Sequence, residues 1–543
     1  MSQKTNILEL KRSKTFYFLL IISFGFGLRL WYFPLDVPIA NDGFFSFVYS
    51  VKTIFDGNLP VGYITTNTGW AYLLSVFFTF FENAEPLQLM NLQRILSVTI
   101  SVLTIIPAFF IFKRFVNEKL ALFGCLLLIL EPRMFLISLE GIDYTLFFFM
   151  IVLSLSLFLK ESKSSIFLSF ICIALASLIR YEAILLLIPF SVIFFVRYRR
   201  KNDILKFIGL SITVLLILVP ISFLRIDATD DYCYNTILGE NCGRDGIFSN
   251  LLDRATSIND KVIGIPDTDD PIYNTDSPMI GHFLFLSFTN LFKFLITILI
   301  PYFFIFLILS VIKFVKKDNW KMNWKIAIII STTCVTLLPA IYAYGRGIEE
   351  YRYVLMAIPL ICIVSISGIE YISKIKNDRR IMVLLISIVI ITSISFIEIK
   401  KIDYQYELES FKISQEIISL SDISNNFDNA KYIKTAQLMD KWPELPEPDE
   451  YGKIKETFHK ISVKEFDNIE SFIIDSEKLG LRYFVVDQNE DLFKELIKNP
   501  DKYSFFNLKF DSQEHGYENI FLIYEIDFNE FNENSEYSLD RLN

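Results

Sequence analysis

The chain has 543 residues, of which 52% are hydrophobic and 16% are aromatic, while only 21% are charged. This composition excludes a disordered chain, a coiled coil and a collagen-like fibre, and a net charge of −9 argues against a nucleic-acid partner. We therefore expect an α-helical polytopic membrane protein whose surroundings are the lipid bilayer.

Eleven apolar segments are long enough to cross or nearly cross a bilayer, for which about 20 residues are needed. They lie at about residues 16–34, 89–112, 119–138, 142–159, 165–180, 182–196, 204–224, 284–312, 325–343, 353–373 and 381–399. The sequence thus predicts a membrane domain over residues 1–400 with about 11 transmembrane helices and two long loops, at about 35–88 and 225–283.

The charge of the loops predicts the orientation of the chain. Every second loop is basic, and basic loops stay in the cytoplasm. These basic regions are the N-terminus and the loops that contain Lys113, Lys160, Arg197, Lys316 and Lys374. We expect a multi-pass protein of the plasma membrane whose N-terminus is cytoplasmic and whose long loops and C-terminal segment face outside. The first span has no small-residue cleavage site, so we interpret it as a retained anchor.

The C-terminal segment, residues 401–543, carries 31 acidic and 16 basic residues, a net charge near −15. Apolar, β-rich stretches occur at 470–475, 482–487 and 520–526, and a helix-like stretch lies at 489–498. Strands that alternate with helices predict a small soluble α/β domain outside the membrane.

The first candidate site residue is Asp42, about eight residues after the first span. An amphipathic, aromatic-rich stretch from Phe44 to Phe55 follows, and we expect it to lie along the membrane interface. Asp42 is either a general base held at the membrane surface or a helix N-cap.

Two more carboxylates, Glu140 and Asp143, share a tight outer turn, where they either serve function or cap the next helix. Just before them, Glu131 and Arg133 flank Pro132 within an apolar run, which is typical of a paired charge at a helix break.

Guanidinium groups also gather at the outer ends of spans. Arg180 either pairs with Glu182 or clamps a phosphate, and the cluster with Arg346 and Arg352 is either an interfacial charge group or an anionic-headgroup site. Arg29 and Arg94 lie near outer ends too, and snorkelling to the interface explains Arg29.

At least two carboxylates and three arginines thus converge on one face of the membrane. This combination suits group transfer from a lipid phosphate, because arginines stabilise a phosphate leaving group while a carboxylate deprotonates the acceptor.

The layout resembles the C-type (GT-C) glycosyltransferases, and most of all family 39, which includes protein O-mannosyltransferases and the aminoarabinose–lipid A transferase. The residues that carry this resemblance are Asp42, Gly57, Gly69-Trp70-Ala-Tyr72-Leu, Arg94, Asp143-Tyr-Thr-Leu-Phe-Phe, Ile179-Arg180-Tyr-Glu182 and Tyr351-Arg352-Tyr353 followed by Pro359. Two motifs depart from the family pattern: Gly43 replaces the second acidic residue, and Asn67-Thr68-Gly69 replaces Lys-Pro-Pro.

The resemblance implies an inverting enzyme that uses a polyprenyl-phosphate sugar donor and a protein, lipid or glycan acceptor. Asp42 would be the base, Asp143 with Glu140 would support the site or bind substrate, and Arg352 with Arg346 would hold the donor phosphate. Arg180 and Arg94 are further candidates for that phosphate.

No cofactor is expected with certainty, and the cysteine and histidine pattern predicts no zinc site. Oligosaccharyltransferases share the architecture and need a divalent metal, but their Trp-Trp-Asp motif is missing from the tail. In the second long loop, Cys233 and Cys242 either form a disulfide, because that face is oxidising, or remain free thiols.

Three other functions stay open. A polymerase or ligase of surface polysaccharide would use the same type of donor. A transporter would place its binding groups near the midplane on two related halves, and the charges here lie at one rim. A receptor would use the acidic C-terminal domain for binding and the spans as an anchor.

Overall fold

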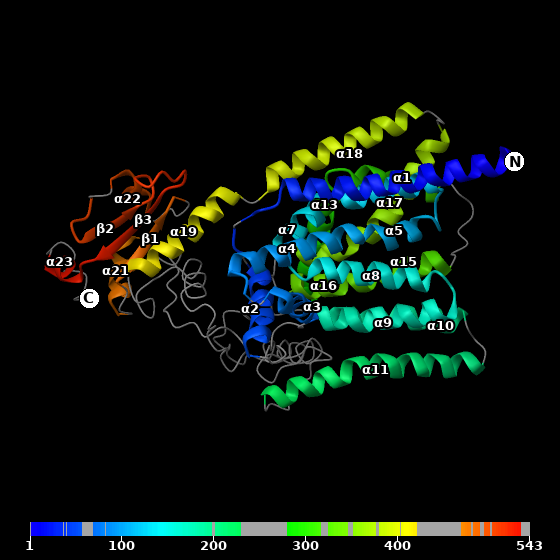
Figure 1. The fold of residues 1–543 in the computed structure, drawn as a ribbon, viewed down its shortest axis with the longest axis horizontal. Coiled ribbons are helices and arrows are strands. Elements are labelled where there is room, and N and C mark those ends of the chain that lie inside the picture. The colour runs from blue at the N-terminus through cyan, green and yellow to red at the C-terminus, as the bar shows by residue number, and fades with distance from the viewer. Residues whose placement is uncertain are drawn as a thin grey trace. The chain divides into compact units, whose positions relative to one another are not determined.

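The computed structural model of the chain is mainly helical and contains one three-stranded sheet (Figure 1). The residues that it describes are 2–35, 37–39, 41–56, 69–81, 83–197, 201–229, 280–315, 324–345, 351–375, 379–401, 403–420, 468–478, 482–488, 493–499 and 502–533. They divide into a first unit with Met1–Phe33, Ala40–Phe80 and Leu92–Lys401, and a second unit with Pro34–Ile39, Phe81–Asn91 and Ile402–Asn543.

All eleven apolar segments are mainly helical where they are described. The elements of this region are α1 (Ser2–Trp31), α2 (Asn41–Asp56), α3 (Gly69–Phe78), η1 (Thr79–Phe81), α4 (Pro86–Leu103), α5 (Ile105–Phe112), α6 (Glu118–Ile129), α7 (Pro132–Glu140), α8 (Tyr144–Phe158), α9 (Lys163–Ile179), η2 (Tyr181–Leu186), α10 (Leu187–Arg197), α11 (Lys201–Thr229), α13 (Ile280–Leu299), α14 (Phe303–Val315), α15 (Trp324–Thr336), α16 (Leu338–Gly345), η3 (Tyr351–Ala357), α17 (Ile358–Ile375) and α18 (Arg379–Lys400).

Fewer than eleven of the described helical stretches are both long enough and apolar enough to span a membrane. By length and composition, three described stretches qualify: Pro86–Phe112, Ala327–Gly345 and Met382–Ile413. Two bent pairs raise the number to five if each pair counts as one span: α6 with α7, bent by 51°, and α13 with α14, bent by 105°. A multi-pass helical architecture is therefore supported, and the count of about 11 crossings stays a prediction.

Both bent pairs break at a proline, and one buried ion pair joins the two breaks. Pro132 is the first residue of α7, and the Glu131 carboxylate accepts from the Met134 backbone amide at 2.7 Å. Arg133 donates to Glu131 at 3.2 Å, which confirms the predicted paired charge, and to the Ile300 carbonyl at 2.8 Å. Because Ile300 lies in the break between α13 and α14, the pair ties one broken span to the other.

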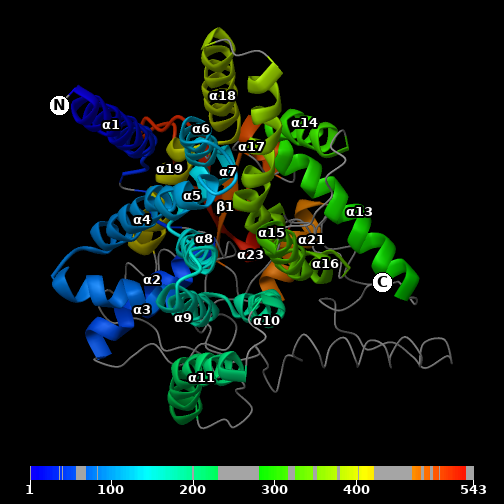
Figure 2. The ribbon, with the colours of Figure 1, turned by 90° about the vertical axis from the view of Figure 1, so that its right-hand side faces the viewer.

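The long helices α8, α9 and α11 run side by side, whereas α2 lies crosswise near one end of them (Figure 1, with the end view in Figure 2). The stretch from Phe44 to Phe55 is helical, and its position at the membrane interface stays a prediction. Helix α8 begins at the end near α2 and finishes at the other (Figure 1).

Arg29 differs from its prediction. Its side chain does not snorkel, since the residue is only 1% exposed and its guanidinium donates to Ser138 Oγ at 3.0 Å and Ser101 Oγ at 3.2 Å. Two backbone carbonyls, of Gly25 and Ile129, accept its remaining hydrogen bonds. The snorkelling interpretation was wrong because hydroxyls and free carbonyls inside the bundle offer this charge the partners that water would supply.

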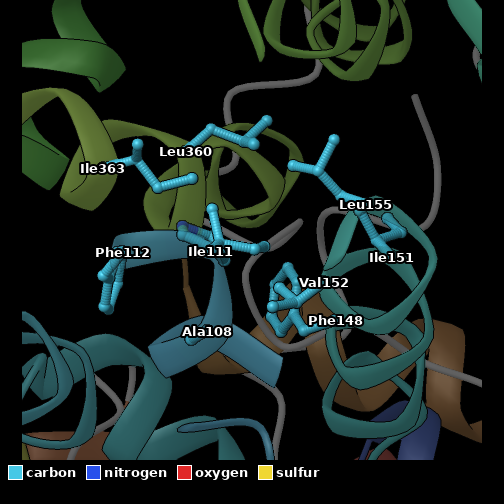
Figure 3. Close-up of a pocket in the computed structure, with 10 residues that line it drawn as sticks. Ala108, Ile111, Phe112, Phe148, Ile151, Val152, Leu155, Leu360 and Ile363 are labelled. Atoms are coloured by element: carbon cyan, nitrogen blue, oxygen red, sulfur yellow. The ribbon is translucent and has the colours of Figure 1, made fainter. Parts of the chain in front are cut away.

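The helix that follows Arg352, α17, is packed tightly into the bundle. Where it meets α5 and α8, Ile111, Leu155 and Leu360 converge around an apolar cavity of only about 10 Å³ (Figure 3). On another face of α17, a Cβ on Gly368 would lie 2.2 Å from the Phe306 carbonyl oxygen of α14. This close packing fixes the position of η3, which carries Arg352, because η3 leads directly into α17.

The second unit contains the sheet, with α19 (Tyr404–Leu420), α21 (Ile469–Lys478), β1 (Tyr483–Asp487), α22 (Lys494–Lys498), β2 (Phe506–Asp511), β3 (Phe521–Ile526) and α23 (Phe528–Glu533). The strand order is β1-β3-β2, all antiparallel. The strands expected at 482–487 and 520–526 are confirmed, whereas β2 was not predicted.

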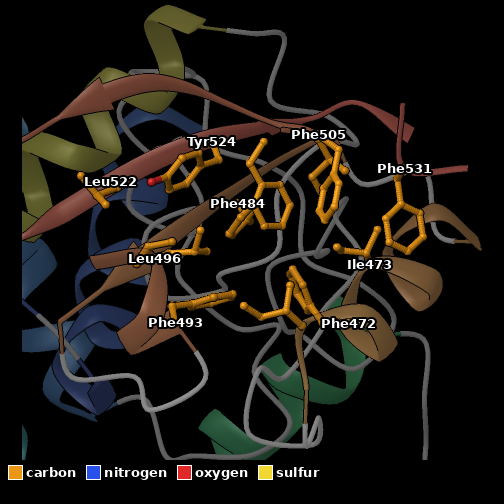
Figure 4. Close-up of a cluster of buried hydrophobic side chains, with 13 residues drawn as sticks. Phe472, Ile473, Phe484, Phe493, Leu496, Phe505, Leu522, Tyr524 and Phe531 are labelled. Carbon is orange, nitrogen blue, oxygen red and sulfur yellow. The ribbon is translucent and has the colours of Figure 1, made fainter. Parts of the chain in front are cut away.

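Both faces of this sheet are covered. One face packs Phe484 and Tyr524 against α21 and α22 (Figure 4), and the other packs Val485 and Ile523 with Ile413 of α19. The β-rich interpretation of 470–475 was wrong, because this stretch lies in α21. Its buried residues Ile469, Phe472 and Ile473 follow the three- and four-residue spacing of one helix face.

Candidate functional site

The first acidic position lies at the start of a helix. Asp42 is the second residue of α2, and the carbonyl of the next residue, Gly43, accepts from Gln93 Nε2 at 2.9 Å. The same amide nitrogen donates to the Gly141 carbonyl at 2.8 Å. One buried side chain of α4 therefore holds the first turn of α2 beside the turn that contains Glu140 and Asp143.

That second acidic turn is built around Gly141. Its φ of 72° closes α7 in the left-handed conformation, which glycine adopts without steric cost, so Glu140 ends α7 and Asp143 immediately precedes α8. Arg94 supports the same turn, since its Nε donates to the Leu139 carbonyl at 3.1 Å and the residue is only 4% exposed.

Trp70 also binds this turn, through a hydrogen bond from Nε1 to the Gly141 carbonyl at 3.0 Å. It is 1% exposed and lies in the protein core. The residue before it, Gly69, allows α3 to approach the end of α9 closely, since a Cβ there would lie 2.6 Å from the Leu178 carbonyl oxygen. The motif Gly69-Trp70 thus connects the Asp143 turn to the Arg180 turn.

Arg180 lies between two carboxylates. Its guanidinium is 3.0 Å from Glu182 and 3.4 Å from Asp143, and it stacks on the Tyr144 ring with 4.5 Å to the ring centre. The Glu182 and Asp143 side chains are 5% and 19% exposed, so Asp143 is the more open of the two carboxylates. Of the two alternatives predicted for Arg180, the pairing with Glu182 is therefore confirmed.

Several buried polar atoms in this cluster have no hydrogen-bond partner among the described residues. They are Gln93 Oε1, Tyr144 Oη, Arg180 Nε and Glu182 Oε2. Buried polar atoms are normally paired, and groups left over at one place indicate a polar ligand or ordered water. The four atoms surround the turn that begins α8, so we place the candidate site there.

Arg352 is linked to this cluster by an electrostatic interaction with Tyr144. It lies in η3, half-buried, with its guanidinium 5.5 Å from the centre of the Tyr353 ring. The Tyr144 hydroxyl is within electrostatic range of Arg352 as well as of Arg180, Asp143 and Glu182. Residues about 200 positions apart in sequence thus contribute charge to one site.

Other predicted site residues lie outside the described part of the chain. These are Arg346, Cys233, Cys242 and the side chain of Asp42. Within the described part, no three His, Cys, Asp or Glu side chains are grouped so that they could hold a metal ion. Asp143, the open carboxylate, already faces Arg180, and a cationic neighbour disfavours a bound cation there.

Two contributors were missed by the sequence analysis, Gln93 and Tyr144. Gln93 is an uncharged amide in an apolar run, and its position beside Arg94 was the signal that could have identified it. Tyr144 follows Asp143 directly and was read only as a trailing aromatic residue.

Comparison with known proteins finds a sequence family that matches part of the chain. The family described as dolichyl-phosphate-mannose-protein mannosyltransferase matches residues 69–224, which contain Trp70, Gln93, Asp143 and Arg180. No curated sequence matches the chain at a significant level.

A solved structure shows a similar fold at low sequence identity. The oligosaccharyltransferase of Archaeoglobus fulgidus in complex with Zn and sulfate has a TM-score of 0.53 and 12% identity, over 87% of this chain and 68% of that chain. ArnT of Cupriavidus metallidurans bound to undecaprenyl phosphate has a TM-score of 0.43 and 13% identity, over 93% of this chain and 97% of that chain. The expected resemblance is confirmed: this chain is similar to the C-type membrane glycosyltransferases, in sequence over residues 69–224 and in fold over most of its length.

Proposed function

We propose that this protein is a membrane glycosyltransferase that moves a sugar from a polyprenyl-phosphate-linked donor to an acceptor on the outer face of the membrane. The observation that supports this most directly is the convergence of the Asp42 turn, the Asp143 turn, Arg180 and Arg352 around Tyr144. The match to a mannosyltransferase family that uses a dolichyl-phosphate sugar supports the donor class.

The proposed reaction is a single displacement with inversion at the anomeric carbon. Asp42 takes the proton from the acceptor hydroxyl or amine as that atom attacks, and the bond from the sugar to the lipid phosphate breaks. The departing phosphate gains negative charge, which a guanidinium stabilises most strongly in a site shielded from water.

We assign the leaving phosphate to Arg352, with Arg346, rather than to Arg180. Both terminal nitrogens of Arg180 already face carboxylates, at 3.0 Å and 3.4 Å, so a phosphate there would meet two negative charges. In this proposal Arg180 orients Asp143, and Asp143 with Glu140 shapes the acceptor side of the site.

A deletion strain complemented with variants tests the proposal. Asp42→Asn, at unchanged membrane level, is expected to lower glycan transfer by about 10²- to 10⁴-fold, because a general base contributes that much. Arg352→Gln is expected to weaken use of the lipid-linked donor, and Arg352→Lys to restore part of it. Mass spectrometry of cell-envelope glycans provides the readout.

Glu118→Gln is the matched control, since it also removes a carboxylate but begins α6, away from the cluster. Full transfer by Asp42→Asn would remove this residue from the role of base. An unchanged glycan profile in the deletion strain itself would contradict the enzyme assignment.

An oligosaccharyltransferase-like reaction is the second candidate, favoured by the fold likeness at a TM-score of 0.53. It predicts that a whole oligosaccharide moves in one step and that a chelator abolishes transfer. Transfer of a single sugar that survives the chelator would instead support the family 39-like reaction.

A further inference from the structure

A groove lies far from the candidate site, toward the opposite end of α8. It has a volume of about 420 Å³, within the range of roughly 300–1,000 Å³ that is typical of ligand sites. Ile106 and Phe110 of α5 form one wall, and Phe149 and Leu153 of α8 form the other. The walls are apolar, so the groove suits a hydrocarbon chain.

The groove opens to the outside of the bundle. Phe110 is 54% exposed and Leu103, at the end of α4, is 39% exposed, and both line it. In a membrane these surfaces face acyl chains, and no part of the described chain covers them.

Two cations line the groove as well, Arg114 after α5 and Lys160 after α8. Arg114 donates to the Leu159 carbonyl at the end of α8, while its Nε is buried and has no hydrogen-bond partner among the described residues. Lys160 is exposed. An apolar groove that ends in two positive charges is complementary to a lipid with an anionic head group.

One carboxylate near this end, that of Glu161, interacts electrostatically with Arg114. Glu161 follows Lys160 in sequence, but it pairs with Arg197 at the end of α10 and with Lys325, at 3.4 Å, at the start of α15. The charge rule places these basic loops at the cytoplasmic face, where anionic phospholipids are concentrated.

We propose that this groove binds one anionic phospholipid, with an acyl chain between Ile106 and Leu153 and the phosphate between Arg114 and Lys160. The site is separate from the proposed donor site. Asp143 precedes α8 and Lys160 follows it, which puts them at opposite ends of a helix about 22 Å long at 1.5 Å per residue. The proposal therefore stands whether or not the protein is a glycosyltransferase.

Native mass spectrometry of the purified full-length chain in detergent tests this binding. Dioleoyl phosphatidylglycerol and dioleoyl phosphatidylcholine are added at equal concentration, and we expect one phosphatidylglycerol to be retained in preference. Arg114→Gln and Lys160→Gln are each expected to lower its affinity about fivefold, as loss of one basic residue near an anionic headgroup does. Lys163→Gln, three residues from Lys160 but not in the groove, should leave the affinity unchanged.

A second variant fills the apolar part and keeps both charges. Leu103→Trp occupies the groove from an exposed position, so it leaves the interior packing alone, and we expect it to exclude the lipid as well. Equal retention of the two phospholipids would overturn the proposal. So would wild-type retention by the Arg114→Gln/Lys160→Gln pair, or displacement of phosphatidylglycerol by stoichiometric undecaprenyl phosphate.

Discussion

A single amide, that of Gln93, joins the two backbone turns that carry the acidic residues. It donates to the carbonyls of Gly43 and Gly141 from a fully buried position, and its own oxygen has no partner among the described residues. Charged residues beside apolar runs could be recognised in the sequence because charge is costly there. The position beside Arg94 could mark Gln93 as a candidate, but it could not show what Gln93 binds, because its partners are main-chain carbonyls, which no residue pattern encodes.

At this scale, Gln93→Leu is expected to destabilise the protein by about 2 kcal/mol, because the Gly43 and Gly141 carbonyls each lose one hydrogen bond while the packing volume is kept. The Gly141 carbonyl keeps its hydrogen bond from Trp70. The substitution should also lower glycan transfer, since the Asp42 and Asp143 turns are no longer held together. Thermal unfolding in detergent and the glycan assay measure the two effects. Gln88→Leu, exposed in the same helix, is the control, and equal behaviour of the two variants would contradict this role for Gln93.

Helices of this fold contact one another at their kinks as well as along their packed faces. The apolar segments predicted the helices, but the kinks of 51° and 105° depend on Pro132 and Pro301 together with the partners that the freed backbone groups find. For the 470–475 stretch, the sequence could not even distinguish a helix from a strand. Its run of apolar residues fits a strand or a helix equally, and only the packing of α21 on the sheet distinguishes them.

The contributions of Glu131 and Arg133 to stability are expected to be strongly coupled, because this ion pair links the two broken spans. Arg133→Met leaves Glu131 buried without its cation and should cost about 3–5 kcal/mol, as removal of one partner from a buried ion pair does. Glu131→Gln combined with Arg133→Met should cost clearly less than the sum of the single changes. Thermal unfolding of the four members of this cycle is the measurement, and strict additivity would show that the pair does not act as a unit.

In the second unit, α19 and the sheet are joined through Glu409, which predicts sensitivity to acid. Burial raises the pKa of Glu409, but hydrogen bonds from the Glu518 and Asn519 backbone amides and from the Asn519 and Gln405 side chains outweigh it, so the net pKa is lowered. A lowered carboxyl pKa stabilises the fold above the usual value of about 4.3, and this stabilisation is lost as the pH falls through the folded pKa.

We therefore expect faster hydrogen exchange in α19 and β3 near pH 4 than near pH 7, after correction for the intrinsic exchange rate. Glu409→Gln should lower stability by about 2 kcal/mol at pH 7 and remove most of this pH dependence. Glu470→Gln, exposed on α21, should behave as wild type. Persistent acid sensitivity in Glu409→Gln would assign the effect to another carboxylate.

For the whole molecule, the alternation of basic loops predicts which side of the membrane each loop faces. It predicts that the N-terminus is cytoplasmic and that residues 401–543 form a domain outside. The composition was sufficient to predict a helical membrane architecture. It could not predict how segments 200 residues apart bring Arg352 toward Tyr144, because that depends on the packing of α17 against α5 and α8.

Protease treatment of intact spheroplasts tests this orientation. An epitope tag after residue 543 should be cleaved from outside, whereas a tag before residue 1 should be protected until the membrane is permeabilised. Two tags cleaved together in intact cells, or two protected together, would give an even number of crossings. The C-terminal domain would then lie on the same side as the N-terminus.

Gly368 has a consequence for how this sequence tolerates variation. A Cβ at this position would collide with the main chain of α14, at the Phe306 oxygen and the Ser310 nitrogen, and main-chain atoms cannot rotate away as a side chain can. A saturation library at codon 368 should therefore keep glycine alone after selection for membrane insertion. For the same reason the short distance between α14 and α17 at this point depends on the absence of a side chain at position 368.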